Sequence, residues 1–359
     1  MSGEVVAVAL SGGVDSSVAA AVLLDRGFRV IGMTMRVAPC DTSQQSTQCD
    51  PPRWVEDAAR VAQALDIPHH IFDLGEPFAR HVIDPFCEEY ARGRTPNPCV
   101  RCNAFIKFGE LLGRARELGA DRLATGHYAR TRHDERSRRW LLLAGVDNAK
   151  DQSYSLYALS QEQLARSLFP LGQMTKSQVR RMAAEAGLPT AARPESQEIC
   201  FLAGQGYREY LQQRRPELAA PGPIVDREGR QLGRHRGIAC YTIGQRHGLG
   251  VASGEPLYVI AIDAAENRLI VGGDDELMSR ALRMREVNYV SLPELPPGGT
   301  TVDAKVRSGA PLAEARAQPD GDGVRLDFAQ PQRAVAAGQA AVCYRGEAVV
   351  AGGTIDSAF

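Results

Sequence analysis

The chain has 359 residues, with 42 basic against 43 acidic residues, 44% hydrophobic residues and 24% charged residues. At about 150 residues per domain, this length predicts two or three domains with ample buried core. The composition excludes a disordered chain, a collagen-like repeat and a protein with a long basic tail. The net charge of −1 still permits a basic face for nucleic acid, because local charge can differ from the total.

The N-terminus predicts neither a membrane span nor a secretion signal. The apolar stretch from Val5 to Leu24 is interrupted by the Ser11–Gly13 turn, and residues 1–4 contain no basic side chain. The eight cysteines are too sparse for a disulfide scaffold in a chain of this length. We therefore expect a cytoplasmic protein without membrane contact and with mostly reduced thiols.

The first half of the chain alternates predicted strands and helices. Apolar runs predict strands at residues 5–10, 30–35, 70–72 and 121–125, separated by helices near residues 16–25, 54–65 and 105–115. The last of these helices is marked by Phe105, Phe108, Leu112 and Ala115. This alternation is typical of an α/β fold with a doubly wound parallel sheet, in which ligands bind at the carboxyl ends of the strands. We assign residues 1–205 to this domain.

The second half changes character after residue 205. Prolines concentrate between Pro216 and Pro223, and short strands separated by turns follow from Ile224 onward. We expect a small β-rich central domain over residues 206–280 and a C-terminal β-barrel over residues 281–359. Residues 302–355 carry about five short strands, and the proline-rich segment Pro293–Gly299 indicates another boundary.

The strongest local motif is the segment Ser11–Ser17, which reads SGGVDSS and links a predicted strand to a predicted helix. Its glycines allow backbone N–H groups to approach a phosphate, and the helix N-terminus favours an anion. Asp15 would repel that phosphate unless Mg²⁺ bridges the two groups. The motif lacks the Lys of the common P-loop and resembles the loop of ATP pyrophosphatases, which cleave ATP to AMP and pyrophosphate. A tight, capped turn without a ligand is the alternative.

A second motif, residues 93–103, is a proline-stiffened loop that carries Cys99 and Cys102. Three arginines and Lys107 flank these thiols, and positive charge favours the nucleophilic thiolate form. A zinc half-site is the alternative, but the chain lacks the complementary C-x-x-C. Only four lysines occur against 38 arginines, so each retained lysine points weakly to a need for a compact ammonium group.

With these motifs the chain resembles the bacterial tRNA-specific 2-thiouridylase family from end to end. Further motifs in the family's order include Ala124–Tyr128, Lys150–Tyr154 and Glu195–Phe201. The chain departs from the family's common pattern at Cys99, where Asp is usual, and at Arg307-Ser308, where Arg-Tyr is usual.

The resemblance implies a site for each partner. ATP is expected at the first loop and at two other strand ends: Ala9, Leu10, Ser11, Gly12, Gly13, Val14, Asp15, Ser16, Met35 and Gly126. Cys102 corresponds to the family nucleophile, and Cys200 corresponds to the persulfide carrier. Contacts with tRNA are expected around the target base and on the barrel: Asn97, Pro98, Cys99, His127, Lys150, Asp151, Gln152, Arg307, Ser308 and Gln339.

The resemblance also implies the reaction, which is ATP-dependent 2-thiolation of the wobble uridine of tRNA. Uridine O2 attacks the α-phosphate of ATP in the presence of Mg²⁺, and sulfur from a Cys200 persulfide then displaces AMP. The implied enzyme is a tRNA-uridine 2-sulfurtransferase that acts as a monomer, with tRNA and a persulfide sulfur-donor protein as partners.

Three alternatives use the same residues differently. An iron–sulfur cluster held by Cys99, Cys102 and Cys200 would carry the sulfur in place of the persulfide relay. A small-molecule ligase with the same loop would adenylate a carboxylate or an amide, but it has no use for the two thiols. A tRNA-binding module without catalysis would not need the nucleotide loop.

Overall fold

The computed structural model describes residues 3–37, 53–194, 199–202 and 204–359. Cys40, Cys49 and the first four residues of the Glu195–Phe201 motif lie outside the described residues. The chain divides into two compact units, of which the first comprises residues 1–81, 99–197 and 347–349. The second unit comprises residues 82–98, 198–346 and 350–359, so the chain passes between the units more than once.

A five-stranded parallel sheet forms the centre of the first unit, with the strand order β3-β2-β1-β4-β7. Its strands are β1 (Val5–Ala9), β2 (Arg29–Arg36), β3 (His69–Asp73), β4 (Arg122–Ala124) and β7 (Ser167–Leu168). In the register, Val6 of β1 pairs with Val30 of β2 and with Arg122 of β4. Because the strands are parallel, their carboxyl ends meet at one edge, where open α/β sheets bind ligands.

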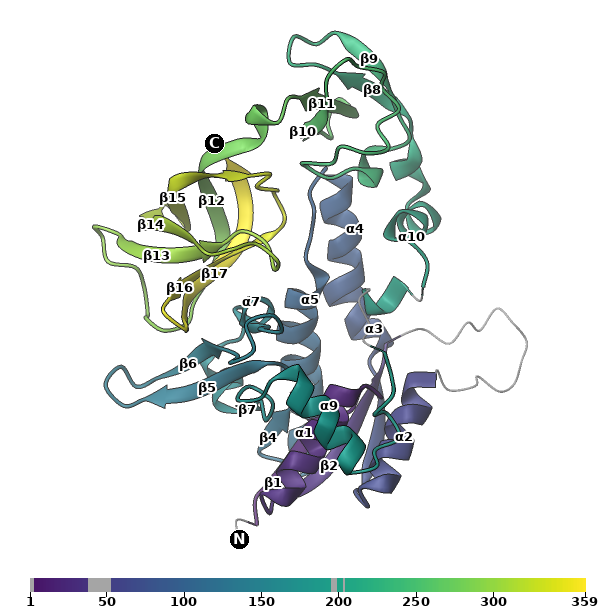
Figure 1. Cartoon of the computed structure of the whole chain (residues 1–359), viewed down its shortest axis with the longest axis vertical. Coiled ribbons are helices and arrows are strands. Elements are labelled where there is room, and N and C mark those ends of the chain that lie inside the picture. The colour runs from purple at the N-terminus through teal and green to yellow at the C-terminus, as the bar shows by residue number, and fades with distance from the viewer. Residues whose placement is uncertain (1–2, 38–52, 195–198, 203) are drawn as a thin grey trace, which may run out of the picture. The chain divides into compact units, whose positions relative to one another are not determined.

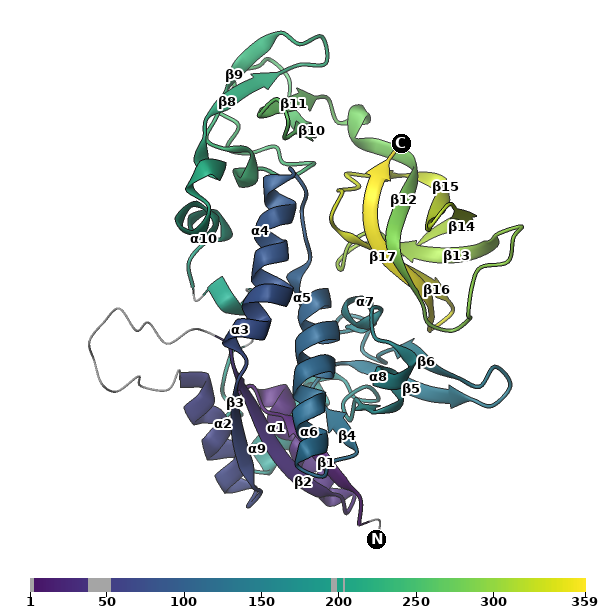
Figure 2. The same cartoon turned by 180° about the vertical axis from the view of Figure 1, so that it is seen from behind.

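Helices cover both faces of this sheet (Figures 1 and 2). Figure 1 shows α1 (Val14–Asp25) and α9 (Lys176–Glu185) in front of it, and α2 (Arg53–Ala64) packs in the same core layer. In that layer Val8 of β1 contacts Leu23 of α1 and Val61 of α2 in one buried cluster. Figure 2 shows α6 (Leu112–Glu117) in front of the opposite face. This layered packing buries both faces of β1, as its continuous apolar sequence predicts.

The helical segment that carries Cys102 is wider than an α-helix. The π-helix η2 (Cys102–Leu111) lies between α5 (Pro98–Arg101) and α6. Its i→i+5 hydrogen bonds change which residues share a face, so α-helical spacing no longer predicts burial. Phe108 is buried, whereas Phe105, which also marks this helix in the sequence, is 43% exposed. π-helices are rare and frequently lie at functional sites.

An antiparallel hairpin follows β4 and was not predicted from the sequence. It consists of β5 (Ala129–Asp134) and β6 (Arg139–Ala144), and its charged tip masks the alternating pattern of the two strands. The short helices α7 (Ser153–Leu156) and α8 (Gln161–Ala165) then lead to β7. Among the helices that the structure describes, none is long and apolar enough to cross a membrane.

The second unit contains a four-stranded sheet with the order β10-β11-β8-β9. Its strands are β8 (Gly222–Val225), β9 (Gln231–His235), β10 (Tyr258–Asp263) and β11 (Arg268–Gly272). The helices α3 (Gly75–Phe78) and η1 (Ala79–Ile83) lead from β3 into its first helix, α4 (Asp84–Ala91). Its other helices are η3 (Cys200–Leu202), α10 (Tyr207–Arg214), η4 (Pro216–Ala219), η5 (Ile238–Cys240) and η6 (Asp275–Leu277).

A closed antiparallel barrel ends the chain. Its strands are β12 (Met278–Tyr289), β13 (Thr300–Lys305), β14 (Ala313–Asp320), β15 (Gly323–Arg333), β16 (Ala340–Arg345) and β17 (Ala348–Ala358). The neighbours run β12-β15-β14-β13-β16-β17, and pairing of β12 with β17 closes the ring. Leu282, Val302, Leu326 and Ile355 fill its interior, as closure over a small number of strands requires.

The predicted fold class, a doubly wound parallel sheet followed by β-rich regions and a barrel, is confirmed. The prediction of a boundary at Pro293–Gly299 is wrong, because this segment connects β12 to β13 within the barrel. Strand β12 is not predicted from the sequence either. Its register shifts near Arg283 and Arg285, and Glu286 has a φ of 54°, so bulges interrupt the period of two that marks a strand.

Candidate active site

The loop between β1 and α1 presents the start of a helix at the ligand-binding edge of the sheet. Gly13 is the N-cap residue of α1, with an extended backbone (φ −99°, ψ 162°) and no side-chain hydrogen bond to the helix. The N–H groups of a first helical turn point outward, and the helix dipole adds partial positive charge to them. The start of α1 can therefore receive an anion such as a phosphate.

Two glycines allow the loop to lie close to its surroundings. Gly12 has a φ of +69°, and a Cβ at this position would lie 2.4 Å from the carbonyl oxygen of Trp54. Gly126 follows β4, and its Cβ would lie 2.7 Å from the carbonyl carbon of Asp15 and 2.8 Å from the nitrogen of Ser16. A side chain at Gly12 would collide with α2, and a side chain at Gly126 would collide with the loop itself. The structure thus brings Gly126 against the loop.

The serine hydroxyls of the loop differ in their surroundings. Ser16 is buried, and its Oγ donates to the carbonyl of Gly13 (3.1 Å) and accepts from the N–H of Ser11 (3.2 Å). The Oγ of Ser17 also donates to Gly13, at 2.8 Å. Ser11 is exposed, with its Oγ 3.2 Å from that of Ser16. Ser11 therefore presents its hydroxyl outward while the other two serines shape the loop.

Asp15 is held by a lysine that lies far away in the sequence. The Nζ of Lys176 donates to both carboxylate oxygens of Asp15 at 2.7 Å, and the hydroxyl of Tyr128 donates to Oδ1 at 2.8 Å. The Lys176 side chain is 12% exposed and that of Asp15 is 33% exposed. Thr175 and Gln178 form a capping box at the start of α9, which fixes the position from which Lys176 projects. A cation thus lies within the loop before any ligand binds.

Arg193 is a second cation on this loop. Its Nη1 donates to the carbonyl of Gly12 at 2.6 Å and also contacts the carboxylate of Asp57. Neither Lys176 nor Arg193 is predicted as a site residue from the sequence. Retention of Lys176 among only four lysines was the one signal for it, and nothing in the local sequence marks Arg193.

The remaining predicted nucleotide residues lie along neighbouring strand ends. Ala9 ends β1 and pairs with Met33 of β2, and the N–H of Leu10 donates to the carbonyl of Met33 at 2.8 Å. Leu10 and Val14 are buried, whereas Met35 near the end of β2 is half-buried. Met35 therefore presents part of an apolar side chain near this edge, where a flat apolar group such as a nucleobase can pack.

The two thiols of the second motif occupy different environments. Cys99 lies in α5 and is exposed, and Cys102 begins η2 and is buried, with 8% of its surface accessible. Arg101, between them, donates its Nε–H to the carbonyl of His81 at 2.6 Å and lies over the ring of Phe105. The guanidinium of Arg101 thus has structural partners of its own.

A buried chain of polar groups starts beside Cys102. The Nζ of Lys107 donates to Oδ1 of Asn103 (3.0 Å) and lies 3.4 Å from Nε2 of His127, whose Nδ1 is 2.7 Å from the hydroxyl of Thr125. Burial, and secondarily the charge of Lys107, holds the pKa of His127 well below its ordinary value. His127 is therefore neutral, with Nε2 accepting from Lys107 and Nδ1–H donating to Thr125.

The Lys150–Gln152 segment is tied to the neighbouring backbone. The carboxylate of Asp151 accepts the N–H groups of Gly145 (3.1 Å) and Ser153 (3.0 Å), and Oε1 of Gln152 accepts the N–H of Tyr128 (3.0 Å). Lys150 is half-buried. These bonds give Asp151 and Gln152 a structural role, and contact of this segment or of the buried His127 with RNA stays a prediction.

The other predicted residues lie in the second unit. Asn97 and Pro98 end the segment after α4, Arg307 and Ser308 are exposed after β13, and Gln339 precedes β16. Cys200 is exposed in η3, which is anchored because the ring of Phe201 packs against Phe86 and Tyr210 with centroids 5.3 Å apart.

Asp15 is the loop residue that suits a magnesium ion. In the part of the chain that the structure describes, no group of three or more His, Cys, Asp or Glu side chains could hold a metal. Mg²⁺, however, commonly binds to one or two carboxylates and takes its other ligands from substrate phosphates and water. Asp15, at a helix start that can receive a phosphate, fits this mode. The iron–sulfur alternative would need a third thiolate beside Cys99 and Cys102.

The parallel sheet, the bare helix start at its carboxyl edge and the appended β-structure define an α/β protein of the HUP class. Family models agree with this class. The model described as the tRNA methyl transferase HUP domain matches residues 4–204. The tRNA methyl transferase PRC-barrel domain matches residues 208–273, and the aminomethyltransferase beta-barrel domain matches residues 279–355.

Whole-chain relatives then give the family. The tRNA-specific 2-thiouridylase MnmA of Moorella thermoacetica is 51% identical over 353 residues, covering 98% of this chain and 99% of that protein. The protein of the same name from Heliobacterium modesticaldum is 48% identical and covers 98% and 92%. Among solved structures, a 4-thiouridine synthetase–RNA complex with bound ATP has a TM-score of 0.36 at 20% identity, over 60% of this chain and 51% of that one. The chain belongs to the tRNA-specific 2-thiouridylase family, as its sequence motifs predict.

Proposed function

We propose that this protein uses ATP to replace O2 of the wobble uridine of tRNA by sulfur. Membership of the tRNA-specific 2-thiouridylase family supports thiolation of a tRNA uridine. One observation supports the use of ATP. The start of α1 has no side-chain cap, and the Asp15–Lys176 pair lies beside it. A triphosphate placed there meets backbone N–H groups and an ammonium group together.

In the first step, uridine O2 attacks the α-phosphorus of ATP, the bond from that phosphorus to the bridging oxygen breaks, and pyrophosphate leaves. The loop N–H groups, the Ser11 hydroxyl and the Lys176 ammonium stabilise the negative charge that develops on the phosphates. Asp15 is the residue that would hold Mg²⁺, which when bound would neutralise further phosphate charge. The thiols take no part in this step.

In the second step, the sulfur comes from a persulfide on Cys200. Its terminal sulfur bonds to C2 of the adenylated uridine as the C2–O bond to AMP breaks, and Cys102 then attacks the Cys200 sulfur to release 2-thiouridine. Alternatively, Cys102 attacks first and frees hydrosulfide, which displaces AMP. Both routes leave a Cys102–Cys200 disulfide, which a dithiol reductant must reduce with two electrons. The exposure of Cys200 suits loading by a separate persulfide-donor protein.

For tRNA binding, we assign catalysis and the contacts of Asn97, Pro98 and Cys99 with the target uridine to residues 1–205. Further RNA contacts are assigned to the regions 206–280 and 281–359 of a monomer. Arg227 and Arg230 pair with carboxylates. Five exposed arginines of the central region make no ion pair with any carboxylate that the structure describes: Arg208, Arg234, Arg236, Arg246 and Arg280. Such cations favour phosphate groups of RNA. The proposed barrel contacts are the exposed Arg307 and Ser308.

The thiols give the sharpest test of this function. Cys102→Ser and Cys200→Ser should each abolish 2-thiouridine formation but leave tRNA-dependent pyrophosphate release, because neither thiol acts on ATP. Cys240→Ser, at a half-buried cysteine of the second unit, is the matched control and should thiolate normally. Pyrophosphate release and mass spectrometry of tRNA nucleosides measure the two steps separately.

The same assays separate the alternatives. Pyrophosphate release that does not require tRNA would indicate a small-molecule ligase, and no release at all would indicate a binding module. Full thiolation by either Cys102→Ser or Cys200→Ser would contradict the persulfide relay. Stoichiometric iron after anaerobic purification, lost together with activity in Cys99→Ala, would replace the relay by an iron–sulfur cluster.

A further inference from the structure

Within the second unit, the turn between β15 and β16 of the barrel forms hydrogen bonds with the segment at residues 94–98. The N–H of Thr95 donates to the carbonyl of Ala337 (2.8 Å), and the carbonyl of Thr95 accepts from Nε2 of Gln339 (2.9 Å). Between these two partners lies Gly338, with a φ of +89°, where a Cβ would stand 2.9 Å from the nitrogen of Thr95. The turn is thus shaped to hold the Thr95 backbone at both its N–H and its carbonyl.

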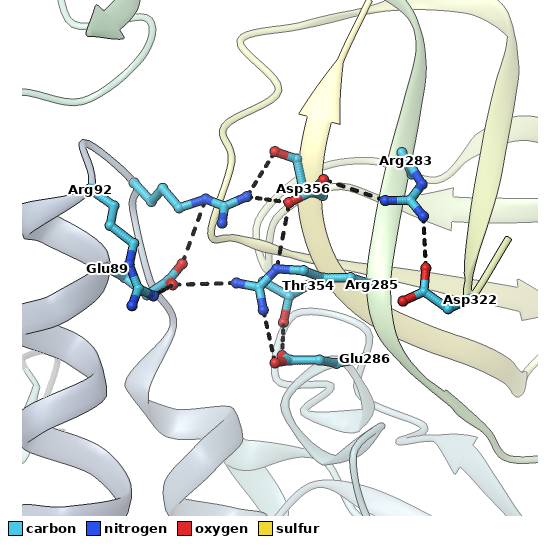
Figure 3. Close-up of polar contacts among 9 residues, drawn as sticks. Glu89, Arg92, Arg283, Arg285, Glu286, Asp322, Thr354 and Asp356 are labelled. Atoms are coloured by element: carbon cyan, nitrogen blue, oxygen red, sulfur yellow. Dashed lines mark hydrogen bonds and ion pairs between the residues drawn. The ribbon is translucent and has the colours of Figure 1, made fainter. Parts of the chain in front are cut away.

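Charge fixes the neighbouring residue, Arg94. Its Nη2 donates to the carbonyl oxygen of Asp356 (2.9 Å) and to Oδ1 of the same residue (2.6 Å). The carboxylate of Asp356 also lies 3.6 Å from nitrogens of Arg283 and Arg285, as Figure 3 shows. The hydrogen bond from Arg94 is the main cause that lowers the pKa of Asp356, so this carboxylate is ionised at neutral pH.

Glu89 of α4 completes the network from the helix side. Its carboxylate lies 3.3 Å from Nη2 of Arg285 and 3.8 Å from Nε of Arg94, and its side chain is only 13% exposed. Figure 3 shows the contact between Glu89 and Arg285. We call Glu89, Arg94, Arg285 and Asp356 the latch. Because these charges are largely buried, removal of one leaves the others without compensation, which is costly.

We propose that the latch and Gln339 position the 94–98 segment for the target base, with Gln339 acting through the carbonyl of Thr95. This inference rests on the proposed function, in which Asn97 and its neighbours meet the uridine. Pro96 and Pro98 fix two φ angles of the segment, so a displacement at Thr95 is passed along the chain. Small misplacements near a reacting centre lower the catalytic rate strongly.

Two nearly isosteric substitutions test the proposal. Gln339→Glu replaces the donor that faces the Thr95 carbonyl by an oxygen, and Asp356→Asn removes the charge that holds Arg94. Each should lower kcat for tRNA-dependent pyrophosphate release by about tenfold, with KM for tRNA unchanged. The double variant should also lose about tenfold, and not a hundredfold, because both changes release the same segment.

Matched controls make the same substitutions elsewhere in the barrel. Gln318→Glu on β14 and Asp327→Asn on β15, where Asp327 pairs with Arg325 at 2.7 Å, should leave kcat unchanged. If Asp356→Asn fails to fold, Gln339→Glu still tests the proposal, because the Gln339 side chain is half-buried and carries no charge in the latch.

Hydrogen exchange gives a readout that does not depend on activity. Because prolines at 96 and 98 carry no N–H, exchange in residues 95–98 reports only on Thr95 and Asn97. Exchange should become faster in Gln339→Glu and in Asp356→Asn. Faster exchange in a protein that never releases pyrophosphate would reject the proposed function and keep the positioning. A raised KM for tRNA with kcat and exchange unchanged, or unchanged exchange in both variants, would overturn the inference.

Discussion

Asp15 in the first unit and Asp356 in the second have equally exposed side chains, at 33% each, but they are held in different ways. Asp15 is held by one ammonium group, from Lys176, and one phenol. Asp356 is surrounded by three guanidinium groups: those of Arg94, Arg283 and Arg285. A lysine on a flexible stem can turn to a new anion, whereas planar guanidinium groups keep a fixed geometry. The Asp15–Lys176 pair therefore suits a site where Lys176 can move to bind an anionic ligand. The guanidinium groups around Asp356 suit a permanent structural contact.

Removing the carboxylate of Asp15 should have the largest effect on ATP turnover. Asp15→Asn takes away both the counter-charge of Lys176 and the side chain that suits Mg²⁺, so we expect ATP turnover to fall by about a thousandfold. Binding of tRNA should change little, since we propose that this loop binds the phosphates of ATP. Pyrophosphate release and filter binding of labelled tRNA measure the two properties.

Asp25→Asn is the control for this change, because Asp25 is exposed at the opposite end of the same helix. It should leave turnover intact. Lost tRNA affinity in Asp15→Asn with normal ATP turnover would show that the loop does not bind the triphosphate.

Removing the cation of the same pair should have a smaller effect. Lys176→Met keeps an unbranched side chain but no charge, and we expect a fall of about a hundredfold in pyrophosphate release, with a higher KM for ATP. Arg181→Met, an exposed position on the same helix, should behave like the unaltered protein. Equal activities of these two variants would mean that Lys176 only supports the fold around Asp15.

Lys107 offers a second comparison, because its hydrogen-bond partners are neutral. The effect of the pair Lys107 and His127 is expected in the stability of the protein. Folded His127 stays neutral because burial lowers its pKa, while in the unfolded chain it gains a proton below about pH 6.5. Stability should therefore fall as the pH drops below 6.5, by about 1.4 kcal/mol per pH unit for this group. His127→Gln cannot titrate and should lose this slope.

Urea denaturation between pH 5 and pH 7 measures the slope. His133→Gln, at a half-exposed histidine on β5, is the control and should keep the pH dependence. Identical slopes for His127→Gln and the unaltered protein would show that His127 is protonated in the folded state.

The sequence predicted the parallel sheet and the turn between β1 and α1 well, because their signals are local. An apolar run, two glycines and a helix start fall within residues 5–25. Phe105 was misleading because the π-helix abandons the period on which the apolar pattern depends. β12 escaped notice because its bulges break the alternation of a strand. Local irregularities thus explain why Phe105 was misleading and why β12 was missed.

The candidate site was only half visible in the sequence. Asp15 lies within a recognisable motif, but the lysine that holds it is 161 residues away, and only the fold brings them together. Gln339 and Thr95 are 244 residues apart and meet in the same way. Spacing along the chain cannot reveal such pairs, because a hydrogen bond between distant segments leaves no local periodicity.

The π-helix η2 (Cys102–Leu111) has a consequence for insertions and deletions. Each residue of an α-helix turns the chain by about 100°, so deleting one residue from this wide stretch would return it toward α-helical geometry and rotate Cys102 against Leu112 by about that angle. Substitutions at exposed positions such as Phe105 leave the register unchanged. A deletion within this segment should therefore disturb the position of the thiol more than a substitution at an exposed position, because the loss of one residue would carry the thiol to another face of the helix.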